Sequence, residues 1–107
     1  MSKISDNATH NGKRQLIIIT GLSGAGKSAV LHTFEDINFQ VVDNLPLSMV
    51  ENLIDDSGRK EGLAPIAIGV DSRTLHFSPN LFVETVARVR ARKDIQLHVL
   101  FMDASVE

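Results

Sequence analysis

The chain has 107 residues, of which 43% are hydrophobic and 22% charged, the size and composition of one small globular domain. Its 11 Lys and Arg residues stand against 13 Asp and Glu residues, and this formal charge of -2 gives no electrostatic reason to expect nucleic acid or membrane binding. The sequence contains no cysteine, which excludes disulfides, thiolate zinc sites and cysteine nucleophiles and fits a reducing compartment.

Residues 1–14 predict a disordered leader, and residues 15–107 predict the folded domain. The leader is polar and contains Ser, Asn and Gly, without the apolar core that a signal peptide needs. The longest apolar runs, at residues 16–19 and 99–102, are far shorter than the ~20 residues that would span a bilayer. We therefore expect a cytoplasmic protein.

The rest of the chain alternates short apolar runs with amphipathic stretches, the pattern of βαβ units on a parallel sheet. Four strands are predicted, at residues 16–20, 39–42, 66–70 and 95–102. The first run is continuous and β-branched, as expected of a strand that is buried on both faces. The last three strands are each followed by an aspartate, namely Asp43, Asp71 and Asp103.

Three helices are predicted between these strands, at residues 27–38, at residues 47–56 and from Pro79 onward. Their apolar residues recur at the 3.6-residue spacing that buries one face of a helix against a sheet. Ser57 and Gly58 are expected to end the second helix, and Ser78 is expected to cap the third. These elements predict an α/β three-layer sandwich with a mostly parallel sheet, which stops after about four strands.

Residues 21–28 read GLSGAGKS and satisfy the phosphate-binding loop pattern between a predicted strand and a predicted helix. Glycines allow successive backbone N–H groups to point into one concavity, and the N-terminus of the following helix adds partial positive charge there. Lys27 is expected to reach the β- and γ-phosphates, and the Ser28 hydroxyl is expected to ligate Mg²⁺. The pattern predicts a P-loop NTPase-type domain that binds ATP or GTP through Gly21, Leu22, Ser23, Gly24, Ala25, Gly26, Lys27 and Ser28.

Hydrolysis or transfer also needs a carboxylate that holds Mg²⁺ through water. Asp71 and Asp103 both follow hydrophobic strands. In the strand order 2-3-1-4 of small P-loop kinases the third strand lies beside the first, which favours Asp71, although Asp103 would border the first strand on its other side. We therefore expect Lys27 and Asp71 to be catalytic and Ser28 and Asp71 to hold the metal, with a helix cap or a solvated strand end as the alternative role of either aspartate.

The stretch GLSGAGKSAVLHTFEDINFQVVDNLPLSMVENLI, followed by IAIGVDSRT and LHVLFMDAS, resembles the N-terminal part of the RapZ/YvcJ family of P-loop nucleotide-binding proteins. The resemblance implies ATP binding at residues 21–28 and a guanine-nucleotide-associated segment at Asp71, Ser72, Arg73 and Thr74. It also implies ATPase and GTPase activity and a relation to RNase adapters, because some members of the family bind small RNAs. Ser72 and Thr74 differ from the residues that the family shows more often at these positions.

Members of that family continue through an arginine-rich segment and a C-terminal domain associated with RNA binding. The resemblance therefore implies that an RNA or protein partner would be bound through a region C-terminal to these residues, and that hydrolysis by this part alone would be weak. Two alternatives stay open. One is a small-molecule kinase, which has the same plan of loop, helix and strands, and the other is a nucleotide-dependent switch with negligible turnover.

A basic cluster follows the start of the third predicted helix, at Arg88, Arg90, Arg92 and Lys93. Such a cluster can contact RNA phosphates. The cluster has no aromatic residues among its cations for base stacking, and cations are favoured at a helix C-terminus, so a solvated helix end is the expected role.

Overall fold

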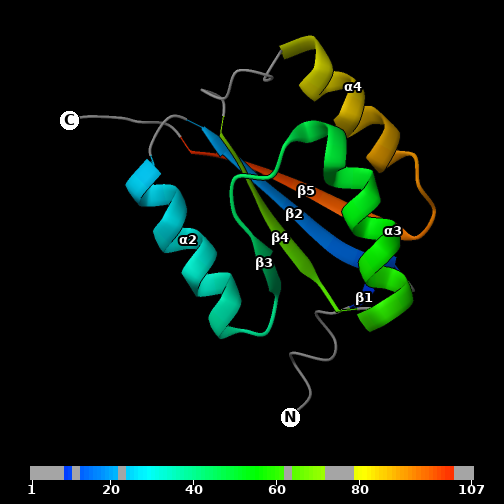
Figure 1. The fold of residues 1–107 in the computed structure, drawn as a ribbon, viewed down its shortest axis with the longest axis horizontal. Helices are drawn as coiled ribbons and strands as arrows, with labels where there is room; N and C mark the ends of the chain where they lie inside the picture. Colours follow the sequence, from blue (N-terminus) through cyan, green and yellow to red (C-terminus); the bar gives the residue numbers. More distant parts are fainter. Residues whose placement is uncertain (1–8, 11–12, 22–23, 62–63, 72–78, 103–107) are drawn as a thin grey trace.

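The computed structural model describes residues 9–10, 13–21, 24–61, 64–71 and 79–102, and Figure 1 shows how their helices and strands are arranged. The strands are β1 (Thr9–His10), β2 (Lys13–Gly21), β3 (Gln40–Val42), β4 (Ile66–Asp71) and β5 (Ile95–Met102). The helices are α2 (Gly24–Asp36), α3 (Val50–Glu61) and α4 (Pro79–Arg90), with a 3-10 turn, η1, at Leu47–Met49.

Four of the strands form a parallel sheet in the order β3-β4-β2-β5, and β1 pairs antiparallel with the start of β2. In the numbering of the predicted strands this order is 2-3-1-4, so the predicted α/β architecture and strand order are confirmed. β2 lies in the centre, in register with β4 from Leu16 to Gly21 and with β5 from Arg14 to Gly21. The carboxyl ends of the three strands therefore meet around Gly21.

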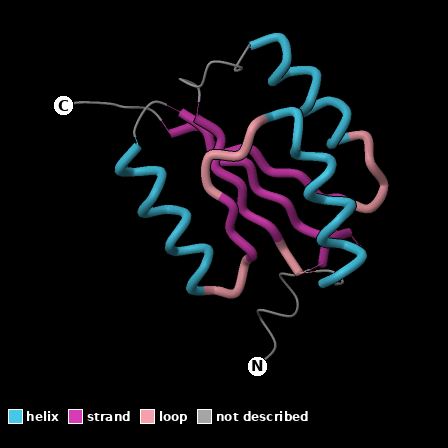
Figure 2. Tube along the Cα trace, in the orientation of Figure 1, coloured by secondary structure: helices cyan, strands magenta, loops and turns pink. Residues whose placement is uncertain are grey.

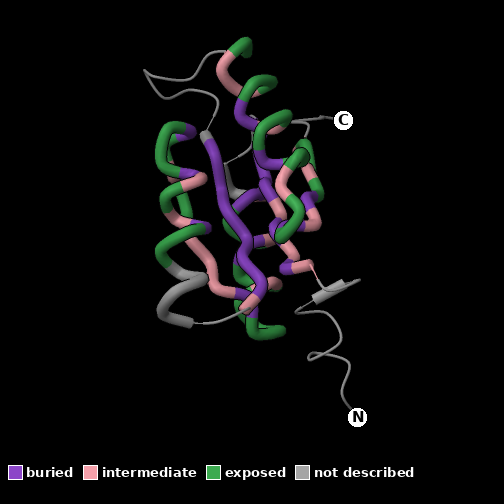
Figure 3. Tube along the Cα trace, turned by 90° about the vertical axis from the view of Figure 1, so that its right-hand side faces the viewer, coloured by how far each residue is buried: buried purple, intermediate pink, exposed green. Residues whose placement is uncertain are grey.

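The helices form two layers, with α2 on one face of the sheet and α3 and α4 on the other (Figure 1). Because crossover connections keep one hand, the reversal of direction after β3 moves the later helices to the opposite face. Successive residues of β2 supply both cores: Ile18 packs with the α3 and α4 side and Ile19 with the α2 side. Figure 3 shows the buried strands running between helices whose outer sides are exposed.

The first strand begins earlier than predicted, at Lys13 rather than at residue 16. Arg14 is only 3% exposed, and its guanidinium donates to the carbonyl oxygens of Ala64 and Ile54. A buried cation that is compensated in this way can extend a strand through a segment that looks polar. Within the predicted leader, Thr9 and His10 pair with β2, while residues 1–8 and 11–12 lie outside the described part of the chain.

Both ends of α2 also differ from the prediction. α2 begins at Gly24, inside the glycine-rich loop, and it ends at Asp36. Ile37, which was predicted to lie in this helix with its apolar face, follows the helix and is exposed. Asn38 follows with φ 73°, a left-handed conformation that asparagine tolerates at a helix end.

α3 continues past Ser57 and Gly58 to Glu61, so the predicted stop there was wrong. A single glycine costs a helix only about 1 kcal/mol, and three good helix formers follow it. Among the described helices, none is both long enough and apolar enough to cross a membrane.

Candidate functional site

The topology puts a switch point at the carboxyl ends of β2 and β4. β2 leads into α2 on one face of the sheet, whereas β4 is followed by α4 on the other face. In open α/β sheets, ligands bind where the connections of adjacent parallel strands leave toward opposite faces. Gly21 and Asp71 are backbone partners at this point. The predicted phosphate loop therefore starts where this architecture binds ligands.

Gly21 occupies a position that no other residue fits. Its φ is +135°, and a Cβ there would overlap the carbonyl oxygen of Met102 and lie 2.8 Å from the Met102 nitrogen. L side chains rarely adopt this backbone conformation, and the neighbouring atoms belong to the β5 backbone, which cannot move aside cheaply. The glycine thus lets β2 end between its two neighbouring strands and turn into the loop.

Lys27 of the motif is buried in the first turn of α2. Its side chain is buried, with 6% of the residue exposed, and Nζ donates a hydrogen bond of 3.2 Å to the carbonyl oxygen of Val70 near the end of β4. An ammonium has three N–H donors, so this bond orients the group without using its full capacity. The cation predicted to bind phosphates therefore lies at the switch point, one turn into α2.

Ser28 is exposed at the same end of α2 and lines a hollow of about 120 Å³. The hollow is also lined by Leu31, His32, Glu35, Val41 and Asp43. Asp43 was grouped with Asp71 and Asp103 as strand-end aspartates that offer the loop a magnesium setting, but it was given no role among the predicted site residues. The structure brings it to the cavity of the predicted magnesium ligand, Ser28, which makes it a candidate site residue in its own right.

A signal for Asp43 was nevertheless present in the sequence. Gly69 interrupts the β-branched and apolar run of β4, and a glycine inside a strand often marks the close approach of another group. A Cβ at position 69 would lie 2.7 Å from Asp43 Oδ1. The approaching group is therefore the Asp43 carboxylate.

The rest of the predicted site is described in part. Gly24 and Ala25 form the first residues of α2, and Gly26 follows them in that helix. Only the backbone of Asp71 is described, and the predicted residues Leu22, Ser23, Ser72, Arg73, Thr74 and Asp103 lie outside the described ranges. Among the side chains that the structure does describe, no three of His, Cys, Asp and Glu converge on one point as a metal cluster would.

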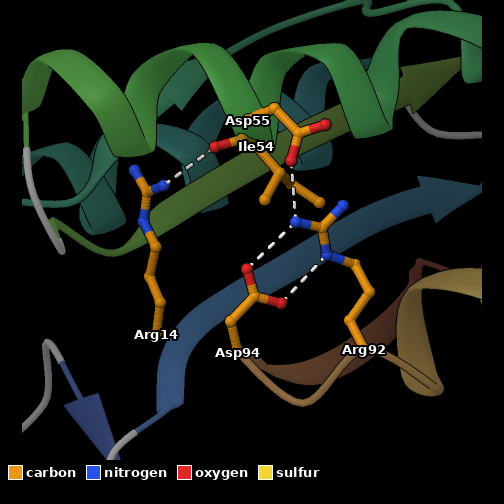
Figure 4. A network of polar contacts seen from close by, with 5 residues as sticks. All are labelled: Arg14, Ile54, Asp55, Arg92 and Asp94. Carbon is orange, nitrogen blue, oxygen red and sulfur yellow. Dashed lines mark hydrogen bonds and ion pairs between the residues drawn. The ribbon is translucent and has the colours of Figure 1, made fainter.

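A network of charged side chains lies at the opposite end of the sheet (Figure 4). Arg92 donates to Asp94 through Nε and Nη2, both at 3.0 Å, and to Asp55 of α3 at 2.7 Å. The hydrogen bonds from Arg92 lower the pKa of Asp94, and those to Asp94 and Asp55 raise the pKa of Arg92. Burial lowers the pKa of the nearby Arg14. The group joins α3 to the turn before β5 and takes no part in the candidate site.

Two members of the predicted basic cluster make ion pairs with α3. Arg88 Nε donates to Glu51 at 3.0 Å, and Arg92 pairs with Asp55. These two cations are thereby engaged in packing α4 and its following turn against α3. The positions of Arg88 and Arg92 agree with the expectation that the basic cluster belongs to the end of a helix.

The chain is similar to known proteins over most of its length. The family model RapZ-like N-terminal domain matches residues 14–107. A protein of Sphingopyxis alaskensis is 41% identical over 103 residues, which cover 95% of this chain and 33% of that protein. Proteins of Erythrobacter litoralis and Zymomonas mobilis are 38% and 43% identical, over 91% and 85% of this chain and 32% and 29% of their own lengths. Each is named a nucleotide-binding protein, and the chain spans about a third of their length.

Proposed function

This chain belongs to the RapZ-like N-terminal domain family, and on that basis we propose that it binds MgATP or MgGTP at residues 21–28. The relatives are named nucleotide-binding proteins, which supports nucleotide binding by this chain. The observation that carries the proposal is the position of Lys27, a buried cation bonded to Val70 at the carboxyl end of the central strands. A buried ammonium is costly unless it has partners, and phosphate oxygens supply them in a site of this kind.

The residues around Lys27 fit a triphosphate. Gly21 lets β2 turn directly into the loop, and the backbone N–H groups at the start of α2 would bind phosphate oxygens. The Ser28 hydroxyl would ligate Mg²⁺, and Asp71, which follows Val70 on β4, would hold that ion through water. Bound Mg²⁺ supplies positive charge that neutralises the phosphate oxygens.

Several finer assignments belong to the same proposal. The segment Asp71, Ser72, Arg73 and Thr74 would contact a guanine nucleotide, and hydrolysis of ATP or GTP would be weak. An RNA or protein partner, as for RNase adapters, would be bound through the part of the longer relatives that this chain does not span. A cytoplasmic location suits a sequence without cysteine.

Transfer to a small-molecule acceptor is the second candidate activity. The hollow beside Ser28 favours it, because His32, Glu35 and Asp43 give the hollow a polar lining that would hold a hydroxyl-bearing acceptor. ATP consumption that requires a particular acceptor, found by screening, would support a kinase. Slow consumption of ATP or GTP without an acceptor would support hydrolysis.

The variant Lys27→Met tests nucleotide binding. Removing the charge while keeping the length of the side chain should weaken nucleotide affinity about tenfold or more, which is ~1.4 kcal/mol or more. The affinity is measured by isothermal titration calorimetry, and circular dichroism checks that the variant is folded. Lys93→Met, which removes an exposed lysine beyond α4, is the matched control and should leave affinity unchanged. Equal affinity in the wild type and a folded Lys27→Met variant would contradict the assignment of the loop.

A further inference from the structure

The turn after β3 crosses to the end of β4. Figure 2 shows this connection as a loop that bends back over the neighbouring strands before α3. Asn44 adopts φ 59° in the turn, and the Leu45 nitrogen donates to the Gly69 carbonyl oxygen at 2.9 Å. Asp43, the first residue after β3, is therefore carried toward β4 by backbone contacts.

Gly69 provides the space that the Asp43 carboxylate occupies. An added Cβ would meet Asp43 Oδ1 at 2.7 Å and Leu31 Cδ1 at 3.0 Å, so the carboxylate lies between the β4 backbone and α2. The next residue of β4, Val70, accepts the hydrogen bond from Lys27. The same short piece of strand thus positions both the predicted phosphate-binding cation and an exposed carboxylate.

Asp43 and Ser28 line one hollow of about 120 Å³. A water molecule requires roughly 10–15 Å³ of such space, so the hollow has room for several waters. A carboxylate beside a triphosphate is repelled by it unless a cation lies between them. Mg²⁺ meets this need, because it prefers oxygen ligands and keeps several of its waters in nucleotide sites.

We propose that Asp43 is a positioning residue for the magnesium ion, accepting hydrogen bonds from water molecules on a Mg²⁺ that Ser28 ligates. The inference rests on the proposed function, since the ion arrives with the nucleotide. It goes further in naming a second carboxylate, from the turn after β3, in addition to Asp71. Gly69 serves the same site by leaving space for that carboxylate.

The variant Asp43→Asn tests the assignment through binding rather than turnover. The affinity for ATP is measured by calorimetry in excess Mg²⁺ and again in EDTA. The quantity compared between variants is the ratio of the affinity with Mg²⁺ to the metal-free affinity. Loss of the carboxylate should lower the affinity with Mg²⁺ and leave the metal-free affinity equal or higher, because a repulsive charge is gone. The ratio should fall about tenfold, the lower end of the range for partners in the outer shell of a metal.

Two neighbouring carboxylates on α2 serve as controls. Asp36→Asn changes an exposed residue near the end of α2 and should leave the ratio unchanged. Glu35→Gln removes a carboxylate that lines the same hollow. Its Oε1 atom lies 3.5 Å from Nδ1 of His32. If Glu35→Gln lowers the ratio as much as Asp43→Asn does, general charge in the hollow explains the effect and the proposal fails.

Gly69→Ala tests the position of the carboxylate with Asp43 still present. The added methyl group should displace Asp43 and lower the ratio, and combining it with Asp43→Asn should lower the ratio no further. If the wild type binds ATP and the ratio is unchanged in Asp43→Asn, the inference about Asp43 is overturned and the proposed function is not. A wild-type protein that binds no nucleotide would instead overturn the proposed function.

Discussion

Gly21 combines two constraints at one residue, a backbone conformation that L side chains avoid and a strand packed against its Cα. Its φ of +135° and the Met102 backbone both exclude a side chain. The glycine of a phosphate loop is usually explained by the ligand alone. Here the sheet demands the same residue before any ligand is bound, because β2 must end between β4 and β5.

Gly21→Ala should therefore destabilise the fold itself. Backbone strain and the overlap with Met102 together should cost about 3 kcal/mol or more. The free energy of unfolding is measured by urea denaturation without nucleotide. Ala87→Gly, at an exposed position in α4, should cost only about 1 kcal/mol. A Gly21→Ala variant as stable as the wild type would show that the loop relaxes around the methyl group.

At the scale of elements, Arg92 joins α3 to the turn between α4 and β5. Its guanidinium bonds one carboxylate from each segment (Figure 4). The side chains of Asp55 and Asp94 are 52% and 61% exposed, so solvent weakens both pairs. Such a link is worth about 1 kcal/mol, well below the value of a buried pair.

Arg92→Ala should lower the free energy of unfolding by about 1 kcal/mol at pH 7. Because Arg92 lowers the pKa of Asp94, this stabilisation is present above the unfolded pKa of ~3.9 and is lost as pH falls through the lower folded value. The difference between variant and wild type should therefore shrink between about pH 4 and pH 2. Urea denaturation over this pH range measures the difference in unfolding free energy. Arg90→Ala, at an exposed position of α4, is the control and should show no such change with pH. A difference that is independent of pH would exclude the link through Asp94.

At the scale of the whole molecule, two cores share one sheet. The core on the α3 and α4 side includes Ile18 and Ile68, and the core on the α2 side includes Ile19 and Leu31. A domain of this size has a total stability of only about 5–15 kcal/mol. A cavity in the central strand therefore removes a large fraction of the stability that holds the loop in place.

Ile18→Ala should cost about 2–5 kcal/mol, since Ile18 is fully buried at 0% exposure. Ile37→Ala deletes the same atoms at a position that is 39% exposed, and it should cost well under half as much. Urea denaturation of both variants gives the comparison. Similar losses at the two positions would mean that the central core does not dominate stability.

The sequence was sufficient wherever the signal is local. The run before Gly21 and the run at Ile95–Met102 predict central strands by their apolar residues, and the predicted bounds of β5 are those observed. The phosphate-loop motif is also local, because a strand, its glycines and the next helix are consecutive. The strand order followed from the resemblance of this plan to small P-loop kinases, and the pairing of β2 with β4 and β5 agrees with it.

Only the tertiary structure decided the features that depend on distant residues. β2 extends back to Lys13 because carbonyl groups 40 and 50 positions away accept from Arg14. Asp43 lies beside the hollow of Ser28 because the turn after β3 crosses to Gly69. Periodicity records which face of an element is apolar, whereas the partner of a polar group is chosen by elements that meet in space. The sequence alone therefore determined the fold class and the candidate loop, and the assembled sheet determined which charged side chains lie at its two ends.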